Sequence, residues 1–179
     1  MGTGVKVLLG VVVVVAALVG LVSMLPTSWE AQGDVRIEAP VALVHEHVND
    51  FHAWRDWATP VEADPTARYA YEGPSSGVGS VQIWWGNSGK GRMKITRSEP
   101  EAGVWYESAV GSDQTNGSGS LTYQADGDAT RVVWRGEGRL WPIIGGVFAA
   151  AIGTGVSDYY DFALGNLKKL VEAKAGSSG

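Results

Sequence analysis

The residues of this chain best suited to metal chemistry lie in one short segment that contains all three of its histidines. His45 and His47 are two residues apart in a segment with helical spacing of its apolar residues. Side chains two apart point to nearly opposite sides of a helix, so this pair cannot face one ion. The zinc-protease pattern, with three residues between the histidines, is absent. We therefore interpret His45, Glu46, His47 and His52 as solvated positions and expect no metal site.

Three acidic residues could supply general acid or base chemistry if they were buried beside a cavity: Asp56, Asp64 and Glu72. Acidic residues near turns are usually hydrated, so we expect no catalytic residue among them. The glycine-rich segment 86–91 is similar in composition to a phosphate-binding loop. No Ser or Thr follows its lysine and it lies between two expected strands, so a glycine-rich hairpin is the better interpretation. Residues 73–77 match the Gly-x-Ser-x-Gly pattern, but they lie in an expected turn and not between a strand and a helix, as a nucleophile elbow requires. No cysteine occurs, which excludes a thiolate nucleophile. The sequence thus predicts neither a catalytic centre nor a redox or metal cofactor.

The amino-terminal segment contains a long apolar run, Val5 to Leu25, in which Lys6 is the single charged residue. As a helix it would be about 30 Å long, close to the thickness of a bilayer's hydrocarbon core. A cleaved secretory signal is the alternative, but no small-residue cleavage site follows the run, which ends at Pro26. The sequence predicts an uncleaved single-pass membrane anchor with a short tether over residues 1–28.

Charge predicts how that anchor would be oriented and which partners the remaining chain could have. Lys6 precedes the apolar run and Glu30 and Asp34 follow it, so the positive-inside rule places the globular part outside the cytoplasm. Only one of the 14 basic residues precedes Glu30, which leaves 13 basic against 19 acidic residues in the rest. An acidic domain without a basic patch is a poor nucleic-acid partner. Oligomeric state cannot be deduced from the sequence.

The remaining residues, 29–174, have the length of one domain, followed by a Gly-Ser-rich tail at 175–179 that we expect to be disordered. Alternating side chains predict a strand at 34–38, and Pro40 precedes a short helical pattern over 41–49. From 67 to 140, alternating runs are separated by turn residues, which indicates an antiparallel meander. The turn segments are 73–77, 87–89, 99–101, 116–117 and 126–127.

The last segment has the pattern of a long amphipathic helix that must bury one stripe on the sheet. That stripe consists of Ile152, Val156, Tyr159, Ala163, Leu167 and Leu170. The start of this segment, 140–157, is uncharged, but its four glycines and Pro142 argue against a second membrane span. We hypothesise instead a mobile lid that touches the bilayer. The fold class predicted is α+β, with one antiparallel sheet and a long carboxyl-terminal helix.

Several sequence blocks, in this order, resemble the START-like superfamily of polyketide cyclases and lipid-transfer proteins (SRPBCC), and more narrowly its bacterial members with one amino-terminal membrane helix. The blocks are Phe51-x-x-Trp54-x-x-Trp57-x-x-Pro60, Asp64-Pro65, Gly73-Pro74-x-Ser76-Gly77-Val78-Gly79, Trp85-x-Asn87, Gly89-x-Gly91-x-Met93-x-Ile95-x-x-Ser98-Glu99-Pro100, Thr130-Arg131-Val132-x-Trp134 and Asp161-Phe162-x-Leu164-x-Asn166-Leu167-Lys168. The resemblance covers roughly Val35 to Glu172. It implies a helix-grip fold, in which a curved sheet wraps the last helix around a cavity for an apolar or amphipathic molecule.

Eight tryptophans and six tyrosines supply candidates for the wall of that cavity. Indole and phenol side chains combine a large apolar surface with a polar tip that can orient a ligand. The residues expected to contact a bound molecule are Trp54, Trp57, Tyr71, Trp85, Tyr106, Trp134 and Tyr159. The alternative is that these rings simply fill the core.

The function predicted is sequestration of a small hydrophobic or amphipathic molecule, lipid-like or polyketide-like, and the sequence favours a binding protein over an enzyme without deciding between them. One alternative is a cyclase or dehydratase that uses the same pocket, because the resembling family includes such enzymes. Another is a protein-interaction module with a filled interior.

Overall fold

One antiparallel sheet of seven strands forms the body of the domain in the computed structural model, which describes residues 2–58, 64–87, 89–112 and 114–177. The strand order is β1-β7-β6-β5-β4-β3-β2, so β2 to β7 form the predicted meander and β1 pairs with β7. The turn between β6 and β7 uses Gly127 at a φ of +63°, a conformation that suits glycine. The strands are β1 (Ser28–Ile37), β2 (Arg68–Glu72), β3 (Val81–Gly86), β4 (Gly89–Glu99), β5 (Gly103–Val110), β6 (Gly117–Asp126) and β7 (Ala129–Arg139).

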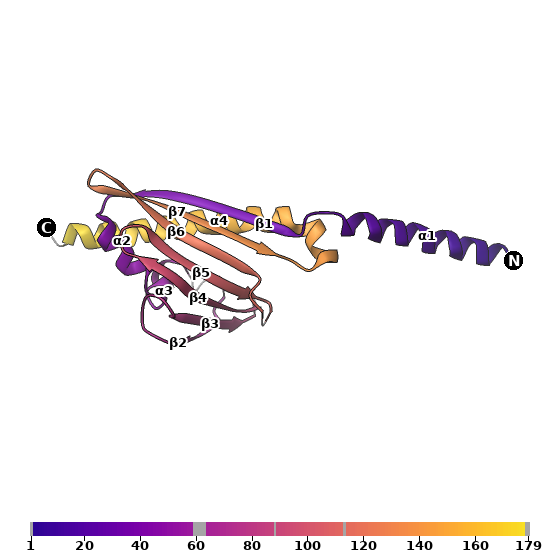
Figure 1. The fold of residues 1–179 in the computed structure, drawn as a ribbon, viewed down its shortest axis with the longest axis horizontal. Helices are drawn as coiled ribbons and strands as arrows, with labels where there is room; N and C mark the ends of the chain where they lie inside the picture. The colour runs from indigo at the N-terminus through magenta and orange to yellow at the C-terminus, as the bar shows by residue number, and fades with distance from the viewer. Residues whose placement is uncertain (1, 59–63, 88, 113, 178–179) are drawn as a thin grey trace.

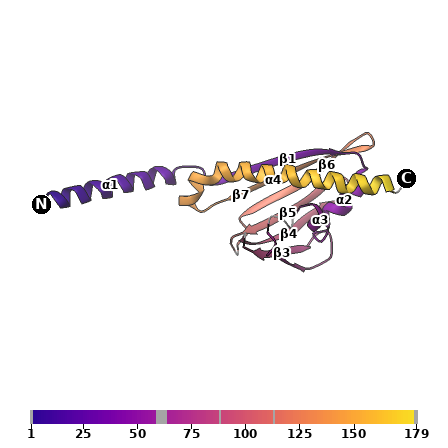
Figure 2. The same cartoon turned by 180° about the vertical axis from the view of Figure 1, so that it is seen from behind.

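Four helices accompany the sheet in the described part of the chain: α1 (Thr3–Ser23), α2 (Val41–Val48), α3 (Trp54–Trp57) and α4 (Pro142–Ser177). The long helix α4 runs behind the sheet in Figure 1 and in front of it in Figure 2, along β1. The predicted α+β class, with one antiparallel sheet and a long last helix, is confirmed. Because α4 continues to Ser177, the expected tail is helical over 175–177, and residues 178–179 lie outside the described residues.

The side of the sheet that faces α4, here called the inner face, carries the hydrophobic core. Ile37, Ile95, Leu121 and Val132 on this face are fully buried, and their neighbours along each strand point to the opposite, outer face. On α4 the buried stripe runs through Tyr160, Ala163, Leu164, Leu167 and Val171. The predicted stripe is therefore right for Ala163 and Leu167 but is rotated at Tyr159, which is 38% exposed while Tyr160 is buried.

The amino-terminal apolar run forms α1, a helix that projects from one end of the domain (Figure 1). Within the part of the chain that the structure describes, no helix has the length and apolar character needed to cross a membrane, so the predicted single-pass anchor is not supported. Most large apolar side chains along α1, among them Leu8, Val12 and Leu18, are more than half exposed. Its last turn ends beside the start of α4, which α1 contacts.

Candidate functional site

Four of the seven aromatic residues predicted to contact a ligand come together in the core. Trp54 and Trp57 from α3, Tyr106 from β5 and Trp134 from β7 are buried between the inner face and α4. Tyr159 lies beside them, with its ring centroid 5.9 Å from that of Trp134. We call these residues, together with Tyr160, the ring cluster.

The members of the ring cluster pack directly on one another. Trp134 stacks on Tyr160 at 4.1 Å between ring centroids, with an interplanar angle of 10°. Trp54 and Trp57 each pack edge-to-face with Trp134, with ring centroids 5.4 and 5.7 Å from that of Trp134. Such edge-to-face and stacked contacts are those that aromatic rings favour in a packed core. At this point the rings fill the space between sheet and helix.

The polar atoms of the ring cluster are also directed at protein groups. Trp54 Nε1 donates to the Val48 carbonyl at 2.8 Å, and Trp134 Nε1 donates to the Tyr106 hydroxyl at 2.8 Å. The Tyr159 hydroxyl donates to the Ala58 carbonyl at 2.5 Å. Burial raises the pKa of the Tyr106 hydroxyl, which keeps that group neutral. The cluster therefore ties α3 and α4 to the sheet.

The other two predicted residues lie apart from the cluster. Trp85 is on the outer face of β3 and is 48% exposed, whereas its neighbour Trp84 faces inward over Gly91. Tyr71 is on the inner face of β2, where its ring stacks on His52 at 3.9 Å between centroids. The structure thus gathers five of the seven predicted residues and separates Trp85 and Tyr71 from them.

Tyr71 lies opposite Gln82, a residue that the sequence did not single out. Gln82 is 1% exposed, and within the part of the chain that the structure describes neither its Nε2 atom nor the Tyr71 hydroxyl completes a hydrogen bond of normal geometry. Burial raises the pKa of the Tyr71 hydroxyl, and the nearby amide of Gln82 partly offsets this. Buried polar groups without a partner are rare because each costs stability. This pair is therefore a candidate for contact with a ligand.

The three histidines of the sequence occupy three different environments. His45 Nδ1 lies 3.3 Å from the Tyr123 hydroxyl, and burial lowers the pKa of its imidazole. His52 pairs with Asp50 at 2.9 Å on the surface. The prediction of a solvated position is wrong for His47, which is 4% exposed because its helix turns that side chain toward the core. Its Nδ1 atom bonds to the Leu43 carbonyl.

The candidate acids stay near turns and strand ends. Asp64 accepts a hydrogen bond from the backbone N–H of Thr66 at 2.9 Å, and Glu72 lies 3.9 Å from Arg92 at the surface. Asp56 is exposed on α3. Segment 86–91 forms the turn between β3 and β4, as its glycines predict, with Ser88 outside the described residues.

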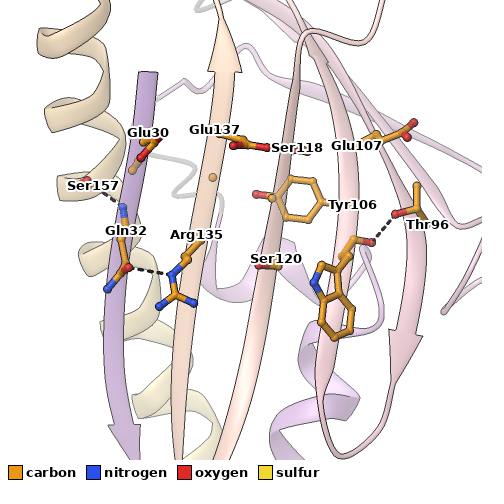
Figure 3. A pocket seen from close by; sticks show the side chains of 14 residues that line it. Glu30, Gln32, Thr96, Tyr106, Glu107, Ser118, Ser120, Arg135, Glu137 and Ser157 are labelled. Atoms are coloured by element: carbon orange, nitrogen blue, oxygen red, sulfur yellow. Dashed lines mark hydrogen bonds between the residues drawn. The ribbon is translucent and has the colours of Figure 1, made fainter. Parts of the chain in front are cut away.

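A hollow of about 730 Å³ lies over β1, β7, β6 and β5 on the outer face, and we call it the outer trough (Figure 3). Glu30, Glu137, Ser118 and Glu107 form one row across these strands, because the strand register places each opposite the next. A second row consists of Gln32, Arg135, Ser120 and Trp105. Most of the lining side chains are therefore polar, and the rings of Trp105 and Tyr106 also line the trough.

Hydrogen bonds hold several side chains of the outer trough in place. Arg135 Nε donates to Gln32 Oε1 at 2.9 Å, and the Ser118 hydroxyl donates to Glu137 at 3.0 Å. Arg97 lies over the ring of Trp105, 4.2 Å from its centroid. Sequence reasoning missed the trough because its residues alternate with core residues, as on any solvated strand face. Only the register brings them side by side.

A family model described as polyketide cyclase/dehydrase and lipid transport matches residues 28–172. The chain belongs to this family. The match covers the whole sheet and most of α4, so the family's unit is the domain that follows α1. No curated protein matches the chain significantly.

Solved structures share the fold of this family member. The Aha1 dimer from Colwellia psychrerythraea is similar with a TM-score of 0.60 and 15% identity, over 80% of this chain and 96% of that one. A protein from Nitrosospira multiformis has a TM-score of 0.58 and 17% identity, over 82% and 98%. DynU16, from the dynemicin biosynthetic locus, has a TM-score of 0.57 and 14% identity, over 80% and 47%. At these identities the likeness concerns the fold alone.

Proposed function

We propose that the domain binds and carries a small amphipathic molecule on the inner face of the sheet, between β2 to β4 and the ring cluster. The observation that carries this proposal is the pair of buried polar groups on Tyr71 and Gln82, neither of which has a hydrogen-bond partner of normal geometry among the described residues. Half-buried inner-face side chains lie beside them, namely Tyr69, Trp84 and Met93. The family's description, which includes polyketide and lipid chemistry, agrees with such a ligand.

In this proposal the ring cluster is one wall of the site and Tyr71 with Gln82 is its polar end. A carbonyl or hydroxyl oxygen placed between these two groups accepts a hydrogen bond from each. Such an oxygen removes a desolvation cost of about 1–3 kcal/mol for each buried donor. Apolar contact contributes on the order of 25 cal/mol per Å² of buried surface. Trp85 faces away from this site, whereas the other six predicted residues lie on or beside it.

The same proposal gives α1 the role of holding the domain against a lipid membrane. Its half-exposed leucines and valines have no cover from the domain, because α1 contacts the start of α4 at its last turn. Burying such side chains in lipid is favourable at about 0.8 kcal/mol per CH₂ group. A carrier of an amphipathic molecule that is held at a membrane lies where such molecules are dissolved.

The test uses prodan, a naphthyl ketone whose fluorescence reports both an apolar environment and hydrogen bonding to its carbonyl. We expect the full chain in phosphatidylcholine nanodiscs to bind prodan more than empty nanodiscs do. Gln82→Leu should weaken that binding about tenfold, because one hydrogen bond and its donor are lost. Tyr71→Phe should act similarly, and Trp85→Phe, which alters a half-exposed ring on the outer face, is the control.

The contrary result is also informative. If Gln82→Leu raises the free energy of unfolding and leaves prodan binding unchanged, the unpartnered amide is a tolerated defect and the proposal fails. Native mass spectrometry of the full chain then distinguishes a carrier from a cyclase or dehydratase. An unchanged co-purified molecule supports the carrier, and turnover products contradict it.

A further inference from the structure

A second hollow, of about 500 Å³, lies between the start of β1 and the first turns of α4, and we call it the end groove. Its lining is mostly small or apolar and includes Pro26, Trp29, Val147, Ala150 and Gly153. Glycine at 153 allows α4 to approach β1 closely, because a Cβ there would stand 2.7 Å from the Glu30 carbonyl oxygen. The end groove is therefore built by close packing of the helix on the strand.

The end groove and the outer trough share two lining residues, Glu30 and Ser157. Ser157 also bonds to the strand, since its hydroxyl accepts from the backbone N–H of Gln32 at 3.2 Å. The two hollows thus meet at the β1 edge. Charged and hydrogen-bonding side chains are concentrated in the outer trough, whereas most residues that line the end groove are small or apolar.

The chemistry of the polar part selects the head group of a ligand. Three carboxylates, Glu30, Glu107 and Glu137, face one guanidinium, Arg135, which already bonds to Gln32. This excess of negative charge disfavours a phosphate or carboxylate head. Serine hydroxyls and the arginine can donate hydrogen bonds while carboxylates accept them, which matches hydroxyl groups because these do both. A purely cationic head is repelled by Arg135 and offers no acceptor to the guanidinium or to the Ser120 hydroxyl.

We propose that the end groove and the outer trough form one binding site for an amphiphile with an uncharged, hydroxyl-rich head, such as an alkyl glycoside. The alkyl chain lies in the end groove and the head contacts Glu137, Ser118 and Arg135 in the trough. The opening of the groove lies where exposed apolar residues gather, namely Trp141 at 82% exposure, Phe148 at 52%, Val147, Met24 and Leu25. This site is on the opposite face from the one proposed for Tyr71 and Gln82, so each can fail alone.

The test compares three photoreactive amphiphiles with the same dodecyl chain bearing a diazirine: a β-glucoside, a phosphate and a trimethylammonium. The full chain in phosphatidylcholine nanodiscs is irradiated, and labelled peptides are identified by mass spectrometry. We expect the glucoside to label residues 26–30 and 147–157 at least fivefold more than the other two. Glu137→Gln, which keeps the shape of the side chain, should lower glucoside labelling about fivefold.

Two further variants test the groove itself. Ala150→Trp fills the end groove from an exposed position on α4 and should abolish labelling there, whereas Ala151→Trp, one residue on and outside the lining, should not. Equal labelling by all three amphiphiles, or labelling that persists in Ala150→Trp, overturns the proposal. Labelling confined to β2 and β3 also overturns it, and at the same time supports the inner-face site.

Discussion

The Tyr160 hydroxyl occupies the space where a side chain at position 136 would stand. A Cβ on Gly136 would lie 2.1 Å from that oxygen, and one on Gly119 would lie 2.3 Å from the Tyr106 hydroxyl. Both hydroxyls press on the backbone of the sheet and lie 3.5 Å from each other. Glycine is therefore required at these strand positions for packing, not for an unusual backbone conformation.

At the scale of single residues we predict opposite effects for two glycine-to-alanine changes. Gly136→Ala should lower the free energy of unfolding by about 1–3 kcal/mol, because the ring pair Trp134 and Tyr160 must shift. Gly155→Ala on α4 has open space around it and should raise the free energy by about 0.5–1 kcal/mol through helix propensity. Urea unfolding of the full chain in detergent measures both. Equal effects would show that Tyr160 moves away freely.

At the scale of single residues, the sequence could not show which of two adjacent aromatic side chains faces the core. Tyr159 and Tyr160, or Trp84 and Trp85, are of the same residue type, so composition does not say which one faces inward. Helix rotation and strand register decide it, and they placed Tyr160 and Trp84 on the inner side. The sequence could not predict that the Nε2 atom of Gln82 is buried without a hydrogen-bond partner among the described residues, because this depends on how the surrounding strands and helices pack.

The elements themselves were largely predictable. Alternation and turn residues between 67 and 140 predicted the antiparallel meander, and the amphipathic pattern predicted the last helix. Two features could be recognised only in the structure. One is the register shift between Ile95 and Arg97 in β4, and the other is the alignment of four residues across four strands, namely Glu30, Glu137, Ser118 and Glu107. Both depend on which residues pair, which a single strand's pattern does not encode.

At the scale of elements, the ring cluster joins α3 and α4 to β7, so its loss should be costly. Trp134→Ala should lower the free energy of unfolding by about 3–5 kcal/mol, since a fully buried ring and its bond to Tyr106 are removed. Trp85→Ala, with its half-exposed ring on the outer face, should cost about 0.5 kcal/mol. Thermal unfolding followed by circular dichroism compares them. Similar losses would contradict the placement of the two tryptophans.

At the scale of the whole molecule, α1 and the domain are distinct in what they expose. The domain has a buried hydrophobic core between its sheet and α4, whereas the apolar side chains of α1 are exposed along its length. The proposed membrane contact predicts that the full chain floats with phosphatidylcholine vesicles in a density gradient. Val13→Asp with Ala17→Asp should abolish flotation, because each carboxylate would lose its hydration on contact with lipid.

The control for that experiment is Gln124→Asp, which adds a charge on exposed β6 and should leave flotation unchanged. A wild-type chain that stays in the dense fraction would contradict the membrane proposal. It would leave the ligand sites on the domain untouched, since neither depends on residues of α1.

The two borders of the sheet differ in how they are covered. Along β1, α4 lies against the strand, and the Ser157 hydroxyl accepts a hydrogen bond from the Gln32 backbone N–H. Without that bond this N–H could pair with a strand of another molecule. The opposite border is β2, which is five residues long and carries charged residues, Arg68 and Glu72, at its ends. Short, charged edges resist strand addition from another molecule. The helix that closes the core thus also protects this protein against edge-to-edge aggregation.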